Sequence, residues 1–238
     1  MIIYSVGNTK WNKYVDLTDN LRKSIHIGDQ LNETSNFNDC TGESISYKND
    51  MYSELTALYW IWKNSKEDII GIEHYRRLFL NSKNENDPLL QKDIVNLLSS
   101  YDMIIPNKHI IKNTIINSEI MPFMPEVLKE VLDIIQILYP SYFSVAKYIM
   151  ENYKWYIHCN MMICKKEIFD DYCKWLFDIL FILEENFKNK YTIEKYSRLY
   201  GFISEHIFII WLAVNKIKCI EKPIVMYNKN VNAIWHYE

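Results

Sequence analysis

Five consecutive polar or amphipathic side chains form the densest group of potential chemistry in the sequence: Glu73, His74, Tyr75, Arg76 and Arg77. They follow a short apolar run at 69–72, which is typical of a strand buried on both faces. Ligands of open α/β sheets bind beyond the carboxyl ends of such strands, so this position favours a site. The two arginines suit an anion, because a guanidinium binds phosphate or carboxylate through paired donors. A surface Glu–Arg pair in a solvated loop is an equally good interpretation of the spacing alone.

The order of these side chains also predicts which way each one points. Successive residues of an extended strand face opposite sides of the sheet. If the strand continues through the group, Glu73, Tyr75 and Arg77 share one side, and His74 and Arg76 share the other.

Three further polar residues lie either at the start of a predicted helix or inside a predicted buried strand. Glu54 opens a predicted helix at 53–64, where a negative charge suits the helix dipole as well as a ligand. Asn160 is the polar residue inside a predicted buried strand at 156–164, so its amide has either a structural or a ligand role. Glu205 stands at the start of a predicted last helix, where it is either a dipole partner or a general base.

The elements that would position these residues alternate between strand and helix. A first strand at 2–6 stops at Gly7, a typical opening of an α/β nucleotide-binding fold. The alternation predicts one mixed α/β domain with a largely parallel sheet. The other expected strands lie at 69–73, 101–106 and 218–226, and the other expected helices at 89–98, 126–138, 141–151 and 166–187.

Composition excludes several classes of protein. The 238 residues are 49% hydrophobic, which is enough for a substantial core, and the net charge of −3 argues against a general nucleic-acid binder. The five cysteines are expected to be free thiols in a reducing compartment. No signal peptide or membrane-spanning run is evident, so we expect a cytoplasmic protein and leave peripheral contact with the inner face of the membrane open.

Familiar catalytic motifs are missing from the sequence. We find no Walker loop, no G-x-G-x-x-G, no G-x-S-x-G and no H-E-x-x-H. A D-x-D at a strand end, which holds metal and diphosphate in many glycosyltransferases, is also missing.

Four blocks of the sequence together resemble a bacterial family long labelled as of unknown function and found in capsule, exopolysaccharide and lipopolysaccharide gene clusters. The segment from Ser-Glu-Leu-Thr to His-Tyr-Arg-Arg is the most specific part. The blocks are residues 41–49, 52–64, 74–77, and 160–163 with 201–205.

This resemblance implies a fold and an activity. Family members are taken to be glycosyltransferases, some of them linked to galactofuranose transfer. The chain at 1–238 would then be a single GT-A-like domain, with a mostly parallel central sheet flanked by helices. Its donor would be a nucleotide sugar, with UDP the first choice, and its acceptor a growing glycan or a lipid-linked glycan.

The resemblance also implies roles for individual residues, with help from a fold-level analogy to D-x-D glycosyltransferases. The two arginines would replace the metal by neutralising the diphosphate directly, so no cofactor is expected. The expected assignments are Glu205 and His74 as catalytic residues, Asn8 and Glu54 on the donor side, Arg76 and Arg77 on the diphosphate, and Asn160 on the sugar hydroxyls.

Other hypotheses stay open at this point. Carboxylates such as Glu73 or Asp39 could still form a metal site. The missing D-x-D also allows a non-catalytic carbohydrate-binding or assembly protein of the same pathway. Transfer of a phosphoryl group is less favoured, because it usually needs a metal-binding carboxylate cluster.

Overall fold

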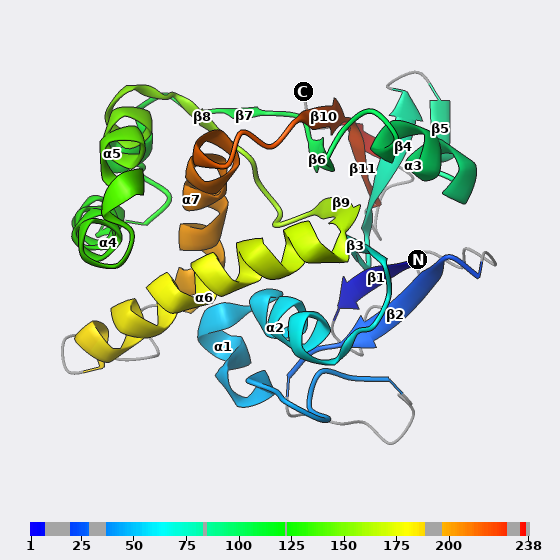
Figure 1. Ribbon diagram of the computed structural model, residues 1–238, viewed down its shortest axis with the longest axis horizontal. Helices are drawn as coiled ribbons and strands as arrows, with labels where there is room; N and C mark the ends of the chain where they lie inside the picture. The colour runs from blue at the N-terminus through cyan, green and yellow to red at the C-terminus, as the bar shows by residue number, and fades with distance from the viewer. Residues whose placement is uncertain are drawn as a thin grey trace.

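The protein folds around a central sheet flanked by helices (Figure 1). The helices α4 and α5 lie at one end of the molecule, and β4, β5 and α3 lie at the other. The computed structural model describes residues 1–7, 20–28, 37–82, 85–121, 123–188, 197–227 and 234–236.

The central part of the sheet has the strand order β2-β1-β3-β9-β6-β10. Strand β1 pairs in parallel with β2 and β3, and β10 pairs in parallel with β6, whereas β9 runs antiparallel to both of its neighbours. The expected α/β fold with a mostly parallel sheet is therefore confirmed. The strands are β1 (Ile2–Gly7), β2 (Arg22–His26), β3 (Ile69–His74), β6 (Met103–Pro106), β9 (Met162–Lys165) and β10 (Cys219–Lys222).

A smaller antiparallel part of the sheet extends from β3. A tight turn at Tyr75 and Arg76 reverses the chain, so that His74 pairs with Arg77 at the start of the next strand. Strand β4 (Arg77–Ser82) then pairs with β11 (Ile224–Tyr227) and β5 (Glu85–Pro88), and β11 pairs with β12 (Ile234–His236). A separate short pair joins β7 (His109–Ile110) to β8 (Trp155–Tyr156).

Two apolar layers cover the sheet because its strands alternate their side chains. Tyr4 and Ile72 belong to the larger core with α2, α4, α6 and α7, whereas Ile3 and Ile163 belong to a smaller core with α3. The helices are α1 (Asn49–Tyr52), α2 (Leu55–Asn64), α3 (Gln91–Leu98), α4 (Met124–Leu138), α5 (Phe143–Asn152), α6 (Lys166–Phe187) and α7 (Leu199–Val214), with 3-10 turns at Ser46–Lys48, Ile115–Asn117 and Pro140–Tyr142.

Three predicted elements differ from the structure. The helix expected at 53–64 is α2, but it begins at Leu55, because Ser53 has a φ of 50° and separates α1 from α2. The strand expected at 156–164 is interrupted by a turn at Cys159 and Asn160. The last helix begins at Leu199 rather than at 205, so Glu205 lies inside α7 and is not a dipole partner at its start.

Within the described residues, no helix has both the length and the apolar composition needed to cross a lipid bilayer.

Candidate functional site

Four of the expected site residues meet beyond the carboxyl end of β3. Glu54, His74, Asn160 and Glu205 are all buried, with 6%, 7%, 0% and 8% of their surfaces exposed. They come from the α1–α2 junction, the end of β3, the turn before β9, and α7. We call these four residues, with Arg77 and Arg198, the polar cluster. Its position at this edge of the sheet is where open α/β folds bind ligands.

Asn160 connects the parts of the polar cluster. Its Nδ2 donates to Glu54 Oε1 at 2.8 Å and to the Gly201 carbonyl oxygen at 3.2 Å. Its Oδ1 lies 2.8 Å from Ser204 Oγ. Both amide hydrogens are therefore used inside the protein, so Asn160 could contact a sugar hydroxyl only through the second lone pair of Oδ1. The amide holds the Glu54 carboxylate in place.

The Glu205 carboxyl group is held beside the same turn. Its Oε1 accepts a hydrogen bond of 2.8 Å from the Cys159 backbone N–H. Burial and then the nearby charge of Glu54 raise the pKa of Glu205 to about 8, against the opposing effects of the Cys159 N–H, Arg198 and Arg77. Glu205 therefore exchanges its proton close to neutral pH, which suits a group that transfers protons.

Arg77 lies on the cluster side of the sheet, next to His74. Its Nη1 donates to His74 Nδ1 at 3.1 Å, which leaves the proton of the neutral imidazole on Nε2. Burial and the charge of Arg77 lower the pKa of His74 to about 3, so this ring is neutral at physiological pH. A catalytic role for His74 stays a prediction, and the contact itself orients the Arg77 guanidinium.

The predicted alternation of side chains is wrong for Arg77, because the chain reverses at residues 75 and 76. Residues paired directly across an antiparallel ladder point to the same side, so Arg77 shares the side of His74 and not that of Glu73. Glu73 instead binds Arg22: Arg22 Nε donates to Glu73 Oε2 at 2.7 Å, and the Phe79 backbone N–H donates to Oε1 at 3.0 Å.

Arg76 has a weaker link to the polar cluster than its neighbour. It lies in the turn, with its guanidinium 5.5 Å from the centre of the Tyr75 ring. Its positive charge also lowers the pKa of His74, but after burial, Arg77 and Arg198 in that order. The structure therefore separates two residues that the sequence treats as a pair.

Arg198 is a member of the polar cluster to which the sequence pattern gives no role. It is exposed, precedes α7 and is held by its backbone N–H, which donates to the Asp50 carbonyl oxygen at 2.8 Å. Its positive charge lowers the pKa of both Glu205 and His74. The sequence shows that Arg198 lies three residues before Gly201, which belongs to one of the family blocks. Nothing in the sequence pattern connects Arg198 to Glu54 or His74, which lie more than a hundred positions earlier.

Four of the five described residues other than glycine with positive φ lie at this site, and the fifth, Lys216, follows α7. Ser53, Cys159, Asn160 and Arg198 have φ values of 50°, 73°, 49° and 63°, a region that residues other than glycine rarely adopt. All four adjoin or belong to the polar cluster. Such conformations cost roughly 1–3 kcal/mol each and are found mostly at functional sites.

Glu73 and Asp39, the two carboxylates that the sequence analysis considers for a metal site, bind other groups of the protein. Glu73 binds Arg22 and the Phe79 N–H, and Asp39 Oδ1 accepts from the Gly28 N–H at 3.1 Å and from Ser46 Oγ. In the part of the chain that the structure describes, no group of three or more His, Cys, Asp or Glu side chains could hold a metal ion.

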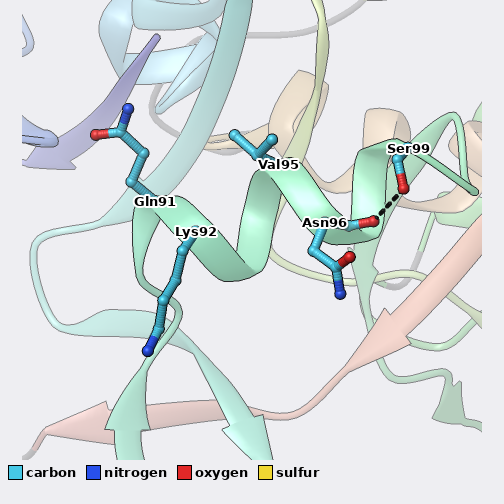
Figure 2. A pocket seen from close by; sticks show the side chains of 5 residues that line it. All are labelled: Gln91, Lys92, Val95, Asn96 and Ser99. Carbon is cyan, nitrogen blue, oxygen red and sulfur yellow. Dashed lines mark hydrogen bonds between the residues drawn. The ribbon is translucent and has the colours of Figure 1, made fainter.

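Two features do not add to the site. Asn8 lies outside the described residues, so its expected donor-side role stays a prediction. Figure 2 shows a hollow against α3 that is lined by side chains of this helix and its last turn, all of them exposed. Because these side chains do not converge on a common point, we give this hollow no role.

Comparison with known proteins places the chain in a family. The model of the family described as "Domain of unknown function (DUF4422)" matches residues 9–216. The chain belongs to this family. Curated proteins give no match.

A solved structure gives a second likeness. The apo structure of the WbbM bifunctional glycosyltransferase superposes on this protein with a TM-score of 0.83 and 26% sequence identity. The likeness covers 96% of this chain and 45% of the WbbM chain, so this chain matches less than half of that protein's length. The fold of this family member is therefore that of a segment of a glycosyltransferase.

Proposed function

We propose that this protein is a glycosyltransferase that moves a hexosyl unit from a nucleotide sugar, with UDP the first choice and galactofuranose one sugar to test, to a growing surface polysaccharide. The observation that carries the proposal is the polar cluster, where a buried carboxyl group and two arginines meet in a fold shared with WbbM. The resemblance to capsule-cluster proteins supports a cytoplasmic reaction at the inner face of the membrane.

The chemistry assigns each group a task. Arg77 and Arg198 would stabilise the negative charge that develops on the leaving diphosphate, because preorganised cations aimed at the position of developing charge lower the barrier. Arg76 would contribute from the turn. Glu205 would accept the proton of the acceptor hydroxyl, and Glu54, held by Asn160, would bind the donor sugar. Asn8 is assigned to the donor side by the resemblance alone.

A donor panel tests the proposal. The protein is incubated with UDP-, GDP- and dTDP-linked sugars, with and without glycan acceptors, and the free nucleotide is measured. The proposal expects release from one class of donor and loss of that release in Arg77→Ala. Binding of the nucleotide without release from any donor would instead favour a non-catalytic carbohydrate-binding or assembly protein.

A further inference from the structure

A second hollow lies against β7 and β8 and differs from the one on α3, because its lining comes from several segments. It has a volume of about 280 Å³. This is close to the lower end of the roughly 300–1,000 Å³ typical of small-molecule sites, and therefore suits one ring rather than a whole nucleotide sugar. Its lining residues are His109, Ile111, Lys112, Asn113, Ser118, Glu119, Ile120 and Tyr156.

One wall of this hollow is rigidly built. The Tyr156 ring stacks on the His206 ring, with centroids 4.4 Å apart and an interplanar angle of 16°. His206 is fully buried, and its two nitrogens lie 2.7 Å from the Phe202 carbonyl oxygen and 2.8 Å from Ser118 Oγ. Since the carbonyl can only accept, Nδ1 carries the proton, and Nε2 accepts from the Ser118 hydroxyl. The aromatic wall is thus fixed before any ligand arrives.

The same wall reaches the polar cluster. Tyr156 stacks on His206, which follows Glu205 in α7. The Cys159 N–H, three residues after Tyr156, donates to Glu205 Oε1 at 2.8 Å. The charge of Glu205 also raises the pKa of Tyr156, after the larger effect of burial. On the neighbouring strand, the His109 ring lies 5.1 Å from the His158 ring, and the pKa of His158 is lowered by burial, His109, Arg77 and His74. A molecule in the hollow would therefore lie against the two segments, β8 and α7, that hold the group we propose as the base.

The lining suits a neutral sugar ring. Tyr156 is buried between His206 and His109, whose ring lies 5.4 Å from it at 73°. The half-buried His109 ring therefore provides the aromatic surface that would pack against the C–H face of a pyranose. Asn113, Lys112 and Glu119 offer donors and acceptors for hydroxyl groups, and Asn113 Nδ2 already donates to Glu119 Oε1 at 2.8 Å. The opposite charges of Lys112 and Glu119 leave no net charge that would select a phosphate.

From this placement we propose that the hollow between β7, β8 and the segment 111–120 binds the terminal sugar of the acceptor glycan. The inference rests on the proposed function, because it names the second substrate of the same site. It also separates the two substrates, with the acceptor on the Tyr156 side of Glu205 and the donor diphosphate on the arginine side.

Glycoside binding tests the inference without requiring turnover. Saturation-transfer NMR with a panel of methyl hexopyranosides would detect binding to the intact protein. We expect at least one glycoside to bind, and to bind about 3–10-fold more weakly to His109→Ala and Asn113→Ala, the effect of losing one contact. Asn152→Ala removes an exposed amide outside the hollow and serves as the matched control.

The outcomes distinguish this inference from the proposed function. Glycoside binding that is unchanged in His109→Ala and Asn113→Ala, or no binding of any glycoside to the wild type, would overturn the acceptor site. The proposed function fails separately, when the wild type releases nucleotide from no donor. In an active enzyme, the two variants should raise the KM of the acceptor more than the KM of the donor.

Discussion

The surroundings of Glu205 disfavour the ionised form of its carboxyl group. Burial and the neighbouring Glu54 raise its pKa to about 8, while the Cys159 N–H, Arg198 and Arg77 limit the rise. The charged form is therefore costly but available near neutral pH. A base with these properties takes up a proton readily, because its pKa is close to the pH at which it works.

The raised pKa of Glu205 predicts a pH-dependent stability. The folded value of about 8 lies above the ordinary value of 4.5, so the folded protein binds more protons between these two values. The stabilising contribution is complete below the ordinary value and is lost as the pH rises through the folded value. Glu205→Gln keeps an oxygen for the Cys159 N–H and removes this titration.

We therefore expect the Tm of Glu205→Gln, relative to the wild type, to rise as the pH goes from about 5 to about 9. Melting curves of both proteins across this range measure the difference. A difference that stays constant with pH would show that Glu205 does not titrate in this way.

The two neighbouring arginines should differ in their effect on donor binding. Arg77 contacts His74 and acts on Glu205, whereas Arg76 lies in the turn over Tyr75. We expect Arg77→Ala to weaken UDP binding by about 10–100-fold, the effect of one charge-assisted hydrogen bond, and Arg76→Ala to weaken it less. Calorimetric titration with UDP gives both values.

Arg77→Lys is the matched control in that titration, because it keeps the charge and removes the paired donors. It should fall between the wild type and Arg77→Ala. An equal or larger loss in Arg76→Ala would contradict the assignment of Arg77 as the main diphosphate ligand.

At the level of elements, the site depends on how closely β1 approaches its neighbours. A Cβ on Gly7 would lie 2.6 Å from Tyr75 Cβ, in the turn that precedes Arg77. A Cβ on Gly71 would lie 2.7 Å from Ile3 Cγ1, inside the smaller core. Both contacts are too short, so each alanine must displace its neighbour, but only the first displaces the turn beside the site.

This contrast gives a prediction at the element scale. Gly71→Ala should destabilise the protein by about 1–3 kcal/mol, as overpacking does, and the correctly folded fraction should bind UDP normally. Gly7→Ala should weaken UDP binding more than Gly71→Ala does, because the turn that carries Arg76 moves. Urea unfolding and UDP titration of both variants measure the two effects. Normal UDP binding in Gly7→Ala would show that the turn does not position the site.

The elements with strong apolar periodicity were predictable from the sequence. The helix at 166–187 matches α6 at both ends, and 126–138 lies within α4. The wrong predictions fall at the site. The break at Ser53 and the turn at Cys159 and Asn160 require positive φ without glycine, which tertiary contacts impose and no local pattern signals. The turn at Tyr75 and Arg76 likewise lacks the residues that usually mark a hairpin.

The candidate site was predictable as a set of residues but not as a geometry. Glu54, Asn160 and Glu205 were identifiable from polarity in an apolar context and His74 from the polar group at the end of its strand, and the four do meet. The sequence could not show that the amide hydrogens of Asn160 are used inside the protein, because Gly201 is distant in the chain. It also could not connect Arg198 to the cluster, since the position of Arg198 depends on where α7 begins.

At the scale of the whole molecule, the two sides of the sheet carry separate groups of buried charges. The buried pair of Arg22 and Glu73 lies on the side of the sheet opposite His74 and Arg77 and binds the Leu89 carbonyl oxygen and the Phe79 N–H. The cations of the polar cluster are therefore not needed to compensate Glu73. Arg77 and Arg198 remain near Glu205, where a substrate anion would add negative charge.

This arrangement predicts activity without a divalent metal. Transfer activity should survive dialysis against EDTA, because arginines can neutralise the leaving diphosphate directly. Nucleotide release before and after EDTA, and after adding back Mn²⁺ or Mg²⁺, is the measurement. A strict requirement for either ion would show that carboxylates of the chain form a metal site.

The most direct test of the account is the turnover of Glu205→Gln with the donor that the wild type uses. Gln keeps the shape and the hydrogen bond to the Cys159 N–H but cannot accept the acceptor's proton. We predict that kcat falls by roughly 10²–10⁴-fold, the usual contribution of a positioned base, while UDP binding stays within a small factor. Glu185→Gln, an exposed change on α6, is the matched control. Near-normal kcat in Glu205→Gln would contradict the account and leave Glu205 as a structural group.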